Sequence, residues 1–119
     1  MRPAQWLTVT TEPAPSIVDG RAGRTRAAFF TEAARVLEFP PYFGHNWDAL
    51  TDCLRDVGTL DLVVAHAEEL LAGEPPEQFA TLLDILATTD GLTLTLSTEP
   101  EHEAALRQRV AEALARPSR

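Results

Sequence analysis

The sequence predicts a small α/β fold in which helices flank a parallel sheet. Strand-like apolar segments alternate with helix-like amphipathic segments along most of the chain, and this order is typical of parallel α/β proteins. Residues 60–65 (LDLVVA) form a nearly continuous apolar run, as central strands of such sheets do. The chain has 119 residues, 45% of them hydrophobic, so we expect one domain over residues 1–119.

Three further segments have the composition of strands. Residues 5–10 (QWLTVT) form the first, and residues 16–19 (SIVD) form a second, shorter one. Residues 92–96 (LTLTL) alternate strictly between leucine and threonine, so this strand should have one covered face and one more exposed face. With residues 60–65, these segments account for the expected strands.

Helical spacing of apolar residues predicts the first two helices. The first spans residues 24–37, with an apolar stripe of Phe29, Ala33, Val36 and Leu37. The second spans residues 47–57, with an apolar stripe of Leu50, Leu54 and Val57. Asn46 is a suitable N-cap for the second helix. In the loop over residues 42–45, Gly44 is the expected site of an unusual backbone angle.

Three more helices are expected in the C-terminal half. A short one over residues 66–72 precedes the breaker GEPP, and another over residues 76–88 starts with proline. Residues 98–101 (TEPE) have the pattern of a capping box formed by Thr98 and Glu101. The helix that this box opens ends near residue 115, and its core face consists of Leu106, Val110, Ala113 and Leu114.

The charge distribution favours a basic partner. The formal net charge is −8 at pH 7, and residues 48–103 hold thirteen acidic residues and a single basic one, Arg55. Such a surface repels nucleic acid and anionic membranes, so we expect neither as a partner, whereas a basic protein suits it. No segment has the length and hydropathy of a signal peptide or membrane span. The lone Cys53 permits no internal disulfide, which fits the reducing cytoplasm.

Most catalytic and cofactor chemistries lack their motifs in this chain. The histidines, His45, His66 and His102, are too widely spaced for a metal motif, and the glycines form no phosphate-binding loop. Cys53 lies beside Leu54 in an expected helix, where a small core residue is a better interpretation than a nucleophile. We therefore expect no metal, no cofactor and no enzymatic activity.

Three carboxylates mark the second helix. Asp48, Asp52 and Asp56 recur at i, i+4 and i+8, so they line one helix face, away from the apolar stripe. Like charges at this spacing destabilise an isolated helix by about 0.2–0.5 kcal/mol per pair. Spacing alone is typical of a solvated helix face. Acid–base catalysis by two of these carboxylates is a weaker alternative, because it needs a pocket.

The run from Phe39 to Leu54 (FPPYFGHNWDALTDCL) resembles the central motif of the barstar family, which comprises intracellular protein inhibitors of secreted microbial ribonucleases. The motif is long and chemically mixed, and weaker similarity extends over residues 16–97. The resemblance implies a three-stranded parallel sheet flanked by helices. Residues 1–15 would then be an N-terminal extension of the family core, and residues 99–115 an extra C-terminal helix.

The resemblance also implies a binding site, because family members block the ribonuclease active site with the second helix and the loop before it. The implied partner-binding residues are Tyr42, Phe43, Gly44, His45, Asn46, Asp48, Thr51, Asp52, Arg55, Asp56 and Asp90. Asp52 would be the anchor, with its carboxylate in place of a substrate phosphate. We expect Trp47 to be a packing residue rather than a partner contact, whereas His45 is equally suited to packing and to contact.

These observations together predict a cytoplasmic bacterial inhibitor, monomeric when free, that binds a small basic microbial ribonuclease one-to-one. It would protect the producing cell before the enzyme is secreted. Two alternatives stay open. One is a barstar-like module for another basic partner, such as a toxin nuclease that it neutralises as an immunity protein. The other is a small enzyme that uses Asp48 and Asp52, which would have to turn over a substrate.

Overall fold

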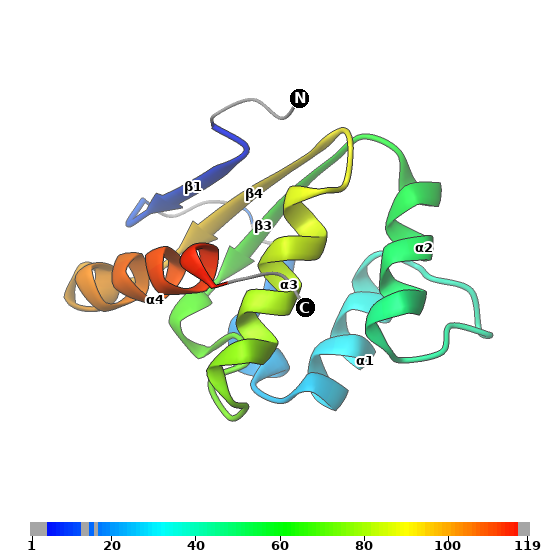
Figure 1. Ribbon diagram of the computed structural model, residues 1–119, viewed down its shortest axis with the longest axis horizontal. Helices are drawn as coiled ribbons and strands as arrows, with labels where there is room; N and C mark the ends of the chain where they lie inside the picture. Colours follow the sequence, from blue (N-terminus) through cyan, green and yellow to red (C-terminus); the bar gives the residue numbers. More distant parts are fainter. Residues whose placement is uncertain (1–4, 13–14, 16, 117–119) are drawn as a thin grey trace.

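The computed structural model contains a four-stranded parallel sheet with helices packed against it (Figure 1). It describes residues 5–12, 15 and 17–116. The strands are β1 (Leu7–Thr10), β2 (Val18–Asp19), β3 (Leu60–Ala65) and β4 (Leu92–Ser97). Their spatial order is β1-β4-β3-β2, and every neighbouring pair is parallel. The predicted α/β class with a parallel sheet is confirmed, and β3 and β4 are its central strands.

Strand β1 makes the sheet larger than the family resemblance implies. It pairs with β4 in register from Leu7 with Leu94 to Thr10 with Ser97 and forms one edge of the sheet. The implied number of three strands is therefore too low by one. The additional strand is the one that the composition of residues 5–10 predicts. At the other edge β2 contains only Val18 and Asp19, and Ser16, where this strand was expected to begin, lies outside the described residues.

The main helices are α1 (Arg26–Val36), α2 (Trp47–Val57), α3 (Pro76–Ala87) and α4 (Glu103–Ala115). Three short 3-10 helices join them to the strands: η1 (Gly20–Gly23), η2 (Ala67–Glu69) and η3 (Pro100–His102). The expected helix over residues 66–72 is wrong, because only η2 forms there. His66 and Leu71 have φ angles of 49° and 56°, and these left-handed residues bound the short turn and prevent a continuous helix.

One face of the sheet carries the core. Leu62 and Val64 of β3 are in register with Leu94 and Leu96 of β4, and each of these four side chains is at most 4% exposed. On the opposite face Asp61 is exposed, and its carboxylate accepts a hydrogen bond from the Thr93 hydroxyl at 2.8 Å. Burial therefore alternates along β3, as the pattern of buried and less buried residues in this strand shows. Figure 1 shows α3 and α4 in front of the strands.

Two expected core residues are exposed, and one expected cap does not form. Val57 and Leu114 are 38% and 50% exposed because each lies in the last turn of its helix, where fewer elements cover it. Thr98 does not form the capping box with Glu101. Its side chain is buried, and its hydroxyl donates to the Glu68 carboxylate at 2.6 Å instead.

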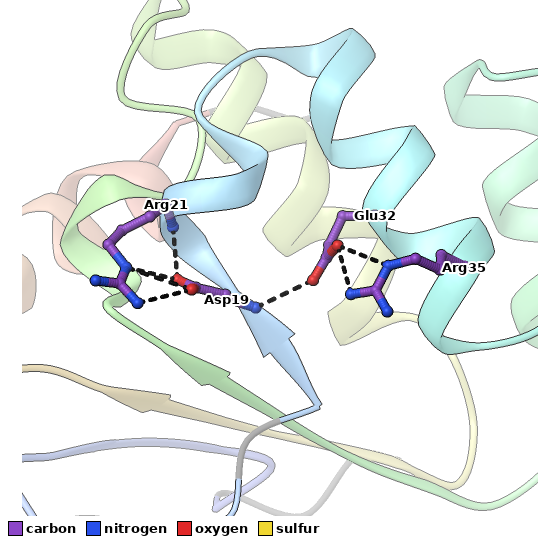
Figure 2. A network of polar contacts seen from close by, with 4 residues as sticks. All are labelled: Asp19, Arg21, Glu32 and Arg35. Atoms are coloured by element: carbon purple, nitrogen blue, oxygen red, sulfur yellow. Dashed lines mark hydrogen bonds and ion pairs between the residues drawn. The ribbon is translucent and has the colours of Figure 1, made fainter.

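A polar network joins β2 to η1 and α1 (Figure 2). Glu32 is only 7% exposed, and its carboxylate accepts from the Asp19 backbone N–H at 3.5 Å and from Arg35 Nη2 at 2.8 Å. The Asp19 carboxylate accepts from the Arg21 backbone N–H at 2.9 Å and from the Arg21 guanidinium at 3.0–3.3 Å. These bonds hold the two-residue strand β2 to the helices that follow it.

None of the helices in the described ranges combines the length and hydropathy that crossing a membrane requires. The molecule measures 39 × 31 × 28 Å along its principal axes. Figure 1 shows α2 at one end of the longest axis and α4 with β1 at the opposite end. The second helix therefore stands at the periphery of the molecule.

Candidate functional site

The N-terminus of α2 is fixed by Asn46. Its side-chain oxygen accepts from the Ala49 N–H at 2.8 Å, which confirms the predicted N-cap, and its amide nitrogen donates to the Gly44 carbonyl at 3.2 Å. One side chain thus ties the helix to the preceding loop. Capping of this kind contributes about 0.5–2 kcal/mol to helix stability.

An aromatic cluster lies beneath the loop. The Phe30 ring of α1 contacts the rings of Trp47 and Phe43 edge-on, with centroids 4.9 Å and 6.0 Å away. Trp47 is half-buried and packs against the core, as expected, and its Nε1 donates to the Gln78 side-chain oxygen at 3.1 Å. Phe43 is only 7% exposed and also packs on Phe39, with centroids 5.0 Å apart. Its ring therefore supports the loop from below.

The unusual backbone angle in the loop belongs to His45, which has a φ of 51°, and not to Gly44. Gly44 leaves room for the capping side chain. A Cβ at this position would lie 3.1 Å from the Asn46 amide nitrogen, which approaches the Gly44 carbonyl. The exposed His45 ring rests against Phe43, with centroids 5.0 Å apart, so one edge packs while the rest of the ring is open to solvent.

The carboxylates of Asp48, Asp52 and Asp56, here called the acidic face, are all exposed on α2. The opposite side of the helix is buried through Leu50 and Leu54, at 1% and 2% exposure. Asp52 forms an ion pair with Arg55 at 3.7 Å, and the two side chains are 77% and 73% exposed. It is the one ion pair of this face among the described residues. Asp48 and Asp56 have no ion-pair partner there. The acidic face therefore keeps nearly all of its charge available.

The remaining predicted contact residues fall into three environments. Tyr42 is 85% exposed in the loop before α2. Thr51 is half-buried, and its hydroxyl donates to the Trp47 carbonyl at 3.0 Å. Asp90 is exposed in the turn between α3 and β4, next to Gly91, whose carbonyl accepts from the Leu60 N–H at 3.0 Å. Asp90 thus lies close to the segment that follows α2, beyond its C-terminal end.

A shallow pocket of about 180 Å³, here called the α1–α2 pocket, opens beside the acidic face. Its wall at the end of α1 consists of Leu37, Glu38, Phe39 and Pro40. Its wall on α2 consists of Cys53, Asp56 and Val57. No pattern in the sequence predicted this pocket. One signal was available: the sequence has no glycine at the end of the first helix, where glycine usually takes a left-handed conformation. Glu38 takes that conformation instead, with a φ of 56°.

Cys53 is half-buried in this pocket rather than fully in the core. Burial raises the pKa of its thiol, and the negative charges of Asp56 and Asp52 raise it further. The thiol therefore stays protonated near neutral pH and is a poor nucleophile. Over residues 5–12, 15 and 17–116, no three histidine, cysteine or acidic side chains lie close enough together to hold a metal ion.

Comparison with known proteins gives one family. The sequence model described as Barstar (barnase inhibitor) matches residues 15–116. The match includes all four main helices and strands β2, β3 and β4, whereas β1 precedes it. No individual curated protein matches the chain.

Proposed function

Because the chain belongs to the barstar family, we propose that it inhibits a small basic microbial ribonuclease by forming a one-to-one complex over the active site. Family membership supports a ribonuclease-inhibitor-like, protein-binding role. The observation that carries the specific proposal is the acidic face, which is exposed on a helix that is itself firmly anchored.

The proposed mechanism follows from what a ribonuclease active site must bind. The site stabilises a phosphate that gains negative charge during the reaction, so it is a concave surface rich in cationic donors. Asp52 lies in the middle of α2 and presents its carboxylate outward. We expect this carboxylate to occupy the phosphate position, where several cationic groups offset the loss of its hydration.

Rigidity of α2 supports this role. The Asn46 cap fixes the start of the helix, and Leu50 and Leu54 fix its buried side. A carboxylate held this way loses little conformational entropy on binding, and preorganisation of this kind increases affinity. The exposed ion pair of Asp52 with Arg55, at 3.7 Å, is long and easily exchanged for a cation of the partner.

The rest of the proposed interface surrounds Asp52. Tyr42, His45 and Asp48 present exposed side chains along the loop and the first turn of α2. The wider negative charge of residues 48–103 accelerates encounter with a basic protein. We further propose that the protein is monomeric when free and acts in the cytoplasm of a bacterium that secretes the ribonuclease.

The test is a titration of the purified protein into barnase and other guanyl-specific microbial ribonucleases while RNA cleavage is followed. We expect cleavage by the cognate enzyme to stop at one equivalent. The Asp52→Asn variant, shown to be folded by its circular dichroism spectrum, should require far higher concentrations. Complete activity of every ribonuclease at several equivalents would contradict the proposal and favour a different basic partner.

A further inference from the structure

The α1–α2 pocket has the size and lining of a receptor for a single long side chain. Its volume of about 180 Å³ is below the roughly 300 Å³ of small cofactor sites, yet it is several times the roughly 30 Å³ that one water molecule occupies in the liquid. We propose that this pocket receives an arginine side chain of the protein partner. The proposal rests on the proposed function in that the partner is taken to be basic.

The pocket walls suit the hydrocarbon stem of such a side chain. Leu37, Phe39 and Pro40 form one wall, and Val57 contributes the other apolar side. Val57 is 38% exposed although the rest of the α2 apolar stripe is buried, so apolar surface is left uncovered here. Arginine covers apolar surface with its stem while its charged end stays at the rim.

The charges of the pocket suit the cationic end. Glu38 and Asp56 are acidic residues on opposite walls, and the residues that line the pocket include no cationic one. Neither carboxylate forms an ion pair with any other described residue. A guanidinium presents several N–H donors in one plane, so it suits a site with more than one carboxylate.

The position of Glu38 is consistent with a binding role. The residue follows α1 with a φ of 56°, where glycine or asparagine is preferred and a glutamate is strained. Strained residues that persist are a reason to look for function. Glycine or asparagine at this position would remove the carboxylate and at the same time suit the backbone better, so the variant should fold at least as well as the parent.

The pocket and Asp52 would bind two separate cationic regions. Asp56 lies one helical turn beyond Asp52 on the same face, and Asp56 itself lines the pocket. Asp52 is placed to enter the partner's phosphate site. The pocket is then placed to take an arginine from the rim of that site, which makes it a determinant of which basic partner binds well.

The pocket can be tested on the free protein, without any ribonuclease. N-acetyl-arginine amide is titrated against the isotope-labelled protein while backbone amide shifts are followed by NMR, and N-acetyl-norleucine amide is the neutral probe. We expect saturable shifts at Leu37, Phe39 and Val57 with the arginine compound only. The Glu38→Asn variant should bind the arginine compound about 1.4- to 5-fold more weakly, as loss of an exposed ion pair implies.

Glu112→Gln, the same loss of charge on α4 at the opposite end of the molecule, should leave the titration unchanged. Equal shifts with both compounds, or shifts spread over all acidic surfaces and unaffected by Glu38→Asn, would overturn the pocket proposal. That result would not affect the inhibition titration, which depends on Asp52. Conversely, the arginine compound could bind saturably in the pocket while no ribonuclease is inhibited. That result would support the pocket proposal and contradict the proposed function.

Discussion

Two groups of charged side chains in this molecule differ in how they are paired and in how deeply their central carboxylate is buried. The network at the β2–α1 junction contains Asp19, Arg21, Glu32 and Arg35, all joined by hydrogen bonds (Figure 2). The acidic face of α2 has three carboxylates and, in the described part of the chain, a single long ion pair. Charges of the first group hold the fold together. Those of the second group contribute little to the fold and remain available to a partner.

Burial explains the difference. Glu32 is 7% exposed, and a buried carboxylate is strongly destabilising unless it is paired and hydrogen-bonded. Asp52, with a side chain 77% exposed, is hydrated and needs no internal partner. The two residues therefore form a natural pair for mutation: removal of one should affect stability, and removal of the other should affect binding.

The largest expected effect is on binding by Asp52→Asn. Loss of a carboxylate that is desolvated among cationic groups of the partner should reduce affinity by about 2–5 kcal/mol, or about 30- to several-thousand-fold. The free energy of unfolding should be unchanged or slightly increased, because repulsion from Asp48 and Asp56 is relieved. Calorimetric titration and urea denaturation measure the two quantities. Glu112→Gln is the matched control, and equal affinities of Asp52→Asn and the parent would remove Asp52 from the interface.

The second expected effect is on stability by Glu32→Ala. This variant leaves the Asp19 backbone N–H without its acceptor and Arg35 without its ion-pair partner. We expect the free energy of unfolding to fall by about 1–3 kcal/mol. Affinity of the folded variant for the inhibited ribonuclease should stay within about twofold of the parent, since such distant sites behave additively. If Glu32→Ala kept the stability of the parent but bound the ribonuclease more weakly, Glu32 would be a binding residue and not a stability residue.

A smaller effect is expected from salt. The association rate with a basic ribonuclease should fall several-fold between about 0.01 M and 0.15 M salt, where the Debye length decreases from about 30 Å to about 8 Å. The unfolding free energy should change much less, because the Glu32–Arg35 ion pair is short, at 2.8 Å, and partly buried, so salt screens it weakly. Stopped-flow mixing at several salt concentrations measures the rate. A rate independent of salt would assign the acidic residues to solubility alone.

The smallest expected effect concerns pH and Asp19. The side-chain hydrogen bond from Arg21 lowers the pKa of Asp19 in the folded protein, although partial burial acts in the opposite direction. Stabilisation from this group is therefore complete above the unfolded-state pKa of about 3.9 and is lost as the pH falls through the lower folded-state value. Asp19→Asn should be less stable than the parent at neutral pH and should approach it in acid. A difference in the free energy of unfolding between Asp19→Asn and the parent that stays constant from neutral to acidic pH would contradict this prediction.

Local signals in the sequence predicted the features that depend on near neighbours. Asn46 caps α2 through Ala49, three residues away, so the start of the helix was predicted to the residue. Helical spacing also predicted correctly that the acidic face points away from the core. Family resemblance located the loop and α2 as the candidate site, but it implied one strand too few.

Features that depend on distant partners were not predicted. Thr98 donates a hydrogen bond to Glu68, thirty residues earlier in the chain, instead of forming a capping box with Glu101. The local TEPE pattern contains no sign of this distant partner. Composition alone cannot show that the Phe43 ring turns inward, because that depends on Phe30 and Phe39. The α1–α2 pocket needs walls from two elements, so neither segment reveals it separately.

Competition with phosphate most directly tests whether Asp52 occupies the phosphate position of the enzyme. Binding of the protein to a ribonuclease that it inhibits is measured by calorimetry with increasing mononucleotide 3′-phosphate, and with sodium chloride at matched ionic strength as control. The apparent Kd should rise in proportion to the nucleotide concentration once the enzyme site is saturated, beyond the rise in the chloride series. An apparent Kd that is equal in the two series would show that the complex leaves the phosphate site free and would contradict this mode of inhibition.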